Sequence, residues 1–125
     1  MRKRVFGLLV AAAVALPVFV ASPANAAPTG HCHWWSEPNV IVGSRGHDRL
    51  VGTDCFDTIF GLQGSDRIIG RSREDTLNGG RGNDRIRAVD GFADLVRCGL
   101  GKRDRAVVDQ YDTATRCETV RIVPV

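Results

Sequence analysis

Five aspartates at intervals of nine residues are the side chains of this sequence best suited to chemistry. The series is Asp48, Asp57, Asp66, Asp75 and Asp84. Glycine recurs in the same phase from residue 43 to residue 79, and leucine or isoleucine from residue 50 to residue 86. Regularly spaced carboxylates are the oxygen ligands that hard divalent cations prefer. They form no obvious pair with separated pKa values, as acid–base catalysis requires, so the pattern favours binding over catalysis.

The repeated unit reads Gly-x-x-x-x-Asp-x-(Leu/Ile)-x, and five units run without a gap from residue 43 to residue 87. Units one, three and five have glycine at the fourth position and arginine after the aspartate, whereas units two and four have neither. Two units therefore make one structural period of 18 residues. The pattern predicts an all-β fold, a right-handed parallel β-roll (β-solenoid) with two short parallel sheets. One aliphatic side chain per unit should point inward: Leu50, Ile59, Ile68, Leu77 and Ile86.

Stacked coils would align the aspartates in two columns, one on each edge of the solenoid. Asp48, Asp66 and Asp84 belong to the odd-numbered units, and Asp57 and Asp75 to the even-numbered units. Neighbours in a column would lie about 4.7–4.9 Å apart, where uncompensated carboxylates repel. Oxygens on opposite sides of a Ca²⁺ ion lie about 5 Å apart, which matches this spacing. The columns therefore predict Ca²⁺ between adjacent coils.

The units resemble the nonapeptide GGxGxDxUx of the hemolysin-type (RTX) calcium-binding repeats, and GGRGNDRIR at 79–87 matches every specified position. The chain is also similar to small secreted actinobacterial calcium-binding proteins, including the segments Arg97-Cys98-Gly99 and Cys117-Glu118. The resemblance implies a β-roll with Ca²⁺ as its cofactor, bound in the turns. Carried over by position, the metal-binding residues are the five aspartates together with turn glycines that offer carbonyls: Gly43, Gly46, Gly61, Gly64, Gly79 and Gly82.

Two departures from the family pattern modify this expectation. Cys55 and Arg73 replace the fourth-position glycine, and Arg73 brings a positive charge, so the even-unit site of Asp57 and Asp75 should be the weaker one. After Arg87 the aspartate spacing slips, and residues 88–125 are predicted to be degenerate repeats and a C-terminal cap.

The N-terminal residues 1–26 have the features of a secretory signal peptide: a basic start, an apolar run and the cleavage motif Ala24-Asn25-Ala26. The apolar run from Val5 to Val20 is too short to span a bilayer. Removing this leader leaves about 99 residues, in which 14 basic side chains balance 14 acidic ones. That balance argues against a nucleic-acid binder judged on overall charge. We expect a secreted, extracellular protein in which residues 27–42 form an N-terminal cap.

Four cysteines in a secreted chain predict two disulfides, for which three pairings are possible. The expected pairing closes the C-terminal segment with Cys98–Cys117 and ties the N-terminal segment to the second turn with Cys32–Cys55. The sequence does not prove this pairing.

No catalytic motif is visible, so we expect no enzymatic activity. The alternative to calcium binding is a metal-independent secreted solenoid that acts as an adhesion or cell-wall interaction module. In that reading Arg49, Arg67 and Arg85 neutralise the aspartate column. An outward patch of Val51, Phe60 and Ile69 contacts an extracellular partner.

Overall fold

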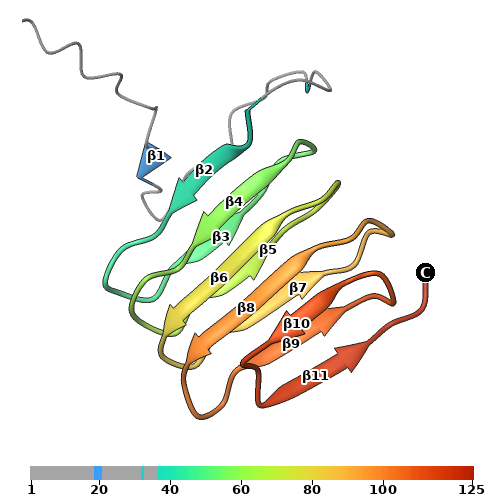
Figure 1. The fold of residues 1–125 in the computed structure, drawn as a ribbon. Coiled ribbons are helices and arrows are strands. Elements are labelled where there is room, and N and C mark those ends of the chain that lie inside the picture. The colour runs from blue at the N-terminus through green and yellow to red at the C-terminus, as the bar shows by residue number, and fades with distance from the viewer. Residues whose placement is uncertain (1–18, 21–31, 33–36) are drawn as a thin grey trace, which may run out of the picture.

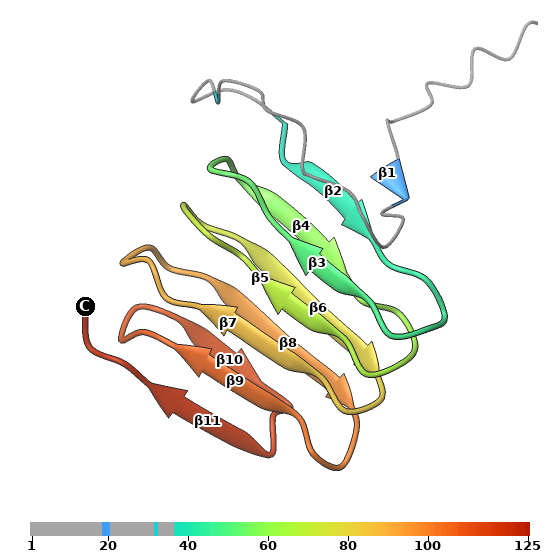
Figure 2. The same cartoon turned by 180° about the vertical axis from the view of Figure 1, so that it is seen from behind.

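The computed structural model describes residues 19–20, 32 and 37–125, and in these ranges the chain consists of β-strands and turns (Figure 1). Each coil contributes one strand to each of two sheets, and successive coils follow one another along the solenoid axis (Figures 1 and 2). No segment of the described chain forms a helix that could span a bilayer.

The first sheet has six strands in the order β1-β2-β4-β6-β8-β10. Their bounds are Phe19–Val20, Asn39–Val42, Asp57–Phe60, Thr76–Arg81, Leu95–Leu100 and Thr113–Thr115. Strand β1 lies within the predicted leader, the rest of which is outside the described residues. If the leader is removed, β2 becomes the first strand of this sheet.

The second sheet has five strands in the order β3-β5-β7-β9-β11. Their bounds are Arg49–Val51, Arg67–Ile69, Arg85–Ala88, Arg105–Val108 and Thr119–Ile122. Every neighbouring pair in both sheets is parallel, and within the repeats partners are 18 residues apart, as in Leu50↔Ile68 and Ile59↔Leu77. The predicted parallel β-solenoid of 18-residue coils is therefore confirmed.

A narrow core fills the space between the sheets. The five predicted inward residues are each no more than 2 % exposed, because alternate residues of a strand point to opposite faces. Beyond the repeats, Val96, Cys98, Ala106 and Val108 continue the same core. One aliphatic side chain per unit is thus enough to form a core only because the side chains of neighbouring coils stack on one another.

The proposed outward patch is wrong. Val51 and Ile69 are register partners in the second sheet, whereas Phe60 lies in β4 of the first sheet, beside Val42 and Asn78. Units alternate between the two sheets, so residues nine positions apart cannot share one outer face.

Both expected disulfides are present, Cys32–Cys55 and Cys98–Cys117. Cys55 lies in the turn before β4, and Cys98 is buried in β8. One bridge joins the segment before β2 to the turn before β4, and the other joins β8 to the segment between β10 and β11, so each connects a terminal segment to the solenoid.

Truncation of one core residue tests the stacked core. Ile68 is fully buried between Leu50 and Ile86 of the adjacent coils. We expect Ile68→Ala to lower the free energy of unfolding by about 2–5 kcal/mol. The matched control Ile69→Ala, on the half-buried outer face, should cost less than about 1 kcal/mol. Urea unfolding followed by circular dichroism measures both, and equal losses would contradict the assignment of the core.

Candidate metal centre

Aspartates at the strand starts form a ladder along the odd-unit edge of the solenoid. The backbone N–H of Asp48 donates to Oδ1 of Asp66 (2.8 Å), that of Asp66 to Asp84 (2.9 Å), and that of Asp84 to Asp104 (2.8 Å). Each carboxylate therefore replaces a main-chain acceptor of the neighbouring coil. The predicted odd-unit residues are brought together in one column.

An equivalent ladder follows the even-unit edge. The N–H of Asp57 donates to Oδ1 of Asp75 (2.9 Å), that of Asp75 to Asp94 (2.8 Å), and that of Asp94 to Asp112 (2.9 Å). Asp57 and Asp75, which were predicted for this edge, are both buried in it.

Sequence reasoning missed the C-terminal members of both ladders. Asp94 and Asp112 extend the even-unit edge, whereas Asp104 and Glu118 extend the odd-unit edge, with Glu118 Oε2 accepting from Asp104 (2.7 Å). The coils lengthen to 19 and 20 residues here, so a strict nine-residue search loses them. The part of the repeat pattern that persists here, and that could have identified these residues, is an aspartate two positions before a buried apolar residue, as in Asp94-Leu95-Val96 and Asp104-Arg105-Ala106.

In the first turn the carboxylate is hydrogen-bonded within its own unit. Ser44 donates its backbone N–H to Oδ2 of Asp48 (2.6 Å), and its hydroxyl contacts both carboxylate oxygens. Gly46 in turn donates its N–H to the Ser44 hydroxyl (3.0 Å). Asp48 thus has partners for both oxygens without a cation.

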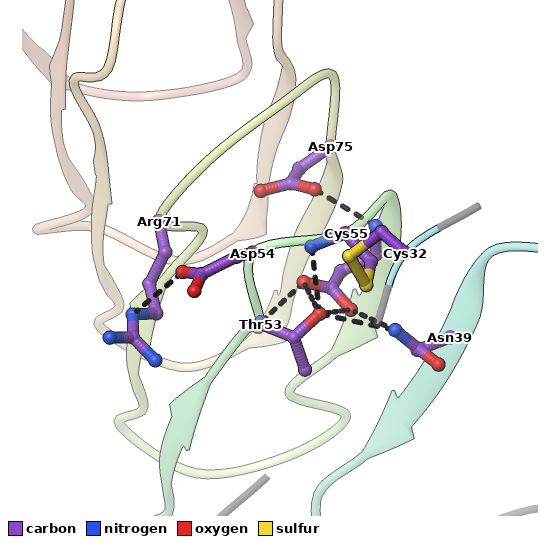
Figure 3. Close-up of a disulfide and its surroundings, with 8 residues drawn as sticks. Cys32, Asn39, Thr53, Asp54, Cys55, Arg71 and Asp75 are labelled. Atoms are coloured by element: carbon purple, nitrogen blue, oxygen red, sulfur yellow. Dashed lines mark hydrogen bonds and ion pairs between the residues drawn. A yellow bond between two sulfur atoms is a disulfide. The ribbon is translucent and has the colours of Figure 1, made fainter. Parts of the chain in front are cut away.

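The second turn repeats this arrangement. The N–H and hydroxyl of Thr53 contact the Asp57 carboxylate, and the Asn39 amide donates to its Oδ1 (3.1 Å). Figure 3 shows Thr53 and Asn39 in this hydrogen-bond cluster, beside the Cys32–Cys55 disulfide. Thr53 occupies the same second position of its unit as Ser44 does.

Several of the following turns leave one carboxylate oxygen of an aspartate without a partner. In the described residues, Oδ2 is buried and makes no hydrogen bond in Asp66, Asp75, Asp84, Asp90 and Asp104. Four of these five are ladder members that are 0–3 % exposed. An unpartnered buried carboxylate oxygen is costly, so these four positions are where a cation would be most stabilising.

These later turns also have a different backbone. In units three, four and five the second and fourth residues have positive φ, namely Leu62 and Gly64, Arg71 and Arg73, and Gly80 and Gly82. The corresponding residues of units one and two do not. The two turn types therefore separate by position along the chain rather than by edge.

The odd-unit turns bring carbonyl oxygens to the unpartnered carboxylates. A Cβ on Gly61 would collide with both Oδ2 of Asp66 and the carbonyl oxygen of Gly79 in the next coil. A Cβ on Gly79 would meet Oδ2 of Asp84 and the carbonyl oxygen of Cys98 in the same way. Glycine is required at these positions because a side chain would fill the space that the two oxygens face.

The Asp75 turn of the even-unit edge lacks this second oxygen. A Cβ on Gly70 would meet Oδ2 of Asp75 and then a Leu77 methyl group, with no carbonyl among its nearest atoms. The guanidinium of Arg73 lies over the Phe56 ring, 5.5 Å from its centroid. Gly52, in the earlier turn of this edge, does face both Oδ2 of Asp57 and the carbonyl oxygen of Gly70, so the missing carbonyl is a feature of the Asp75 turn.

Burial raises the pKa of the ladder carboxyls. It raises the pKa of Asp66 to about 6, that of Asp94 to about 7 and that of Asp75 to about 8, although each accepts a backbone N–H that acts in the opposite direction. Neighbouring aspartates add to the increase, since like charges disfavour ionisation. Asp109 shows the contrast, because burial is outweighed there by the N–H groups of Tyr111, Gly91 and Asp90, and its pKa is lowered.

No arginine or lysine of the described residues forms an ion pair with these carboxylates. Among the described residues one ion pair is present, Arg71–Asp54, on the surface. The proposed neutralisation of the column by Arg49, Arg67 and Arg85 is therefore wrong, because an arginine that follows an inward aspartate points to the outer face. Nor do three carboxylate, histidine or cysteine side chains of the described chain converge on one point, so a bound cation would depend on main-chain carbonyls.

The architecture defines a parallel β-solenoid with buried carboxylate ladders in Gly-rich turns. Residues 37–68 and 60–91 match the model of the RTX calcium-binding nonapeptide repeat (4 copies), and this segment of the chain belongs to that family. The match extends beyond the five predicted units at both ends. No curated protein and no solved structure matched the chain.

The raised pKa values predict that the calcium-free protein loses stability as the pH rises. Between the unfolded value of 3.8 and the value of about 8 at Asp75, the native state binds more protons than the unfolded state. The free energy of unfolding should therefore fall from pH 4.5 to pH 8.5. Thermal melting in chelator measures this, with Asp75→Asn, which should flatten the profile near pH 8, as the comparison variant. Stability that rises over this range would contradict the assignment.

Proposed function

We propose that this is a secreted calcium-binding β-roll protein in which Ca²⁺ joins adjacent coils and stabilises the fold outside the cell. The observation that carries the proposal is the row of buried, unpartnered carboxylate oxygens of Asp66, Asp84 and Asp104 along one edge. Their repeat family is calcium-binding, and disulfides are typical of extracellular proteins. We assign the chain a binding role rather than an enzymatic one.

The donor set fits calcium better than other biological cations. The available ligands are carboxylate oxygens and main-chain carbonyls such as those of Gly79 and Cys98. Calcium accepts six to eight such oxygens in flexible geometry, whereas Mg²⁺ requires a compact octahedron and retains water. When bound, Ca²⁺ would supply positive charge beside the ladder carboxylates, with which no arginine of the described residues forms an ion pair.

The proposed sites are not distributed evenly over the five units. The Asp66, Asp84 and Asp104 positions combine an unpartnered carboxylate oxygen with a glycine contact and a nearby carbonyl, and they are the proposed odd-unit sites. Asp75 has the unpartnered oxygen alone and is the proposed weaker site. Asp48 and Asp57 would form no independent site, since Ser44 and Thr53 donate hydrogen bonds to both oxygens of their carboxylates.

A matched pair of variants tests this distribution. Asp66→Asn and Asp48→Asn make the same chemical change in the same column. Asp66→Asn should lower the calcium stoichiometry and the calcium-dependent rise in melting temperature, whereas Asp48→Asn should leave the stoichiometry unchanged. Ligand at 100 times Kd contributes about 2.7 kcal/mol per site, so the loss is measurable by calorimetry and thermal melting. Equal stoichiometry in both variants, or no calcium effect on the wild type, would overturn the proposal.

The converse change should create a calcium-dependent turn. Ser44→Gly removes the hydroxyl that satisfies Asp48 and permits the positive φ seen at Leu62 and Gly80. We expect lower stability in chelator than the wild type has, and a larger stabilisation by calcium. Ser44→Ala serves as the control, because it removes the hydroxyl without favouring positive φ. If Ser44→Gly shows no greater calcium response than Ser44→Ala, the turn conformation is not what selects the metal.

A further inference from the structure

The outer face of the second sheet carries six arginines and no acidic residue on its strands. Four of them form one column across the sheet in direct register, Arg49↔Arg67↔Arg85↔Arg105. Arg87 and Arg121 belong to the next outward column, where they alternate with the half-buried Val51, Ile69 and Val107. We call these six side chains the arginine face.

The arginine face is not explained by contacts within the protein. All six side chains are exposed, and none forms an ion pair within the described residues, where the single ion pair belongs to Arg71 and Asp54. The strands of the first sheet carry only two exposed arginines, Arg97 in β8 and Arg81 at the end of β6, and their outer face includes Thr58, Thr76 and Thr113. A chain with a small overall charge therefore concentrates positive charge on one of its two faces.

The arginine column borders two shallow hollows. One, of about 350 Å³, is lined by Arg67, Arg85, Arg87 and Arg105 with Ile69 and Val107. The other, of about 430 Å³, shares Arg67, Arg85 and Arg105 and adds Ser65, Asn83 and Arg103, and the buried Asp66 also lines it. The hollows lie along a column that crosses the strands, so a linear molecule could lie parallel to the solenoid axis.

We propose that the arginine face binds a linear polyol-phosphate polymer, an extended chain of phosphodiester groups without bases. Guanidinium groups bind phosphate oxygens in a bidentate manner, and serine and asparagine are common additional donors to phosphodiester backbones. The strands of this face carry no aromatic side chain, whereas proteins that hold single-stranded nucleic acid stack its bases on aromatic rings. The recognised feature is thus a row of regularly spaced phosphates.

Strand spacing determines the charge density of this site. Neighbouring arginines of the column are attached about 4.8 Å apart, and their long side chains can spread to meet phosphates at somewhat larger intervals. The proposed calcium ligand Asp66 also lines the second hollow, so calcium must be held constant when polymer binding is measured. Calcium stoichiometry measured on the same variants distinguishes a failure of the polymer site from a failure of the calcium sites.

The test measures binding of poly(glycerol phosphate) by the full disulfide-bonded protein at one fixed calcium concentration and several salt concentrations. The matched variants are Arg85→Gln in β7 and Arg97→Gln in β8, which remove the same charge from opposite faces. We expect Arg85→Gln to raise Kd about three- to tenfold and to reduce the salt dependence by roughly 0.7 in slope, the value for one contact to a single-stranded polyanion. Arg97→Gln should leave both unchanged.

A triple variant and two competitors complete the experiment. Arg67→Gln/Arg85→Gln/Arg105→Gln should abolish binding while its melting temperature and calcium stoichiometry stay at the wild-type values. Neutral dextran should not compete, and a single-stranded DNA oligonucleotide should compete more weakly than the polyol phosphate. Absence of wild-type binding, equal losses in Arg85→Gln and Arg97→Gln, or preference for the DNA would each overturn the proposal.

Discussion

The hydrogen bond from the N–H of one strand-initial aspartate to the carboxylate of the aspartate in the next coil is the interaction on which this structure depends. It is repeated on both edges, at 2.8–2.9 Å, from Asp48 to Asp104 and from Asp57 to Asp112. It connects successive coils where each turn enters a strand, and it forces the carboxylates into the interior. The thin aliphatic core alone offers little that could hold the turns in register.

Burying a row of carboxylates is energetically costly unless other groups compensate their charge. Ser44 and Thr53 compensate Asp48 and Asp57 with hydroxyl and N–H donors, and Asp109 accepts hydrogen bonds from three N–H groups. Asp66, Asp84 and Asp104 have no such donors for their second oxygen. The fold therefore contains metal-independent turns at its N-terminal end and turns suited to a cation further on.

The alternation of side chains along each strand separates the two charged systems of the molecule. An inward aspartate is followed by an outward arginine, so the carboxylate ladder and the arginine column run parallel without forming ion pairs. Each is left available for a partner of opposite charge. The nearly balanced composition of 8 basic and 7 acidic residues in the repeats conceals this separation.

The sequence by itself determined the solenoid, the inward aliphatic residues and the two aspartate columns, because a nine-residue period specifies which side chains are stacked. It did not determine which carboxylates are satisfied, since Ser44 and Leu62 occupy the same position of their units yet lead to opposite outcomes for Asp48 and Asp66. Nor did it place Asp94 and Asp104, where longer coils break the period but the hydrogen-bond register between strands is kept. Only the tertiary structure decided these points, because hydrogen-bond satisfaction depends on the atoms of the neighbouring coil and on turn conformation rather than on spacing along the chain.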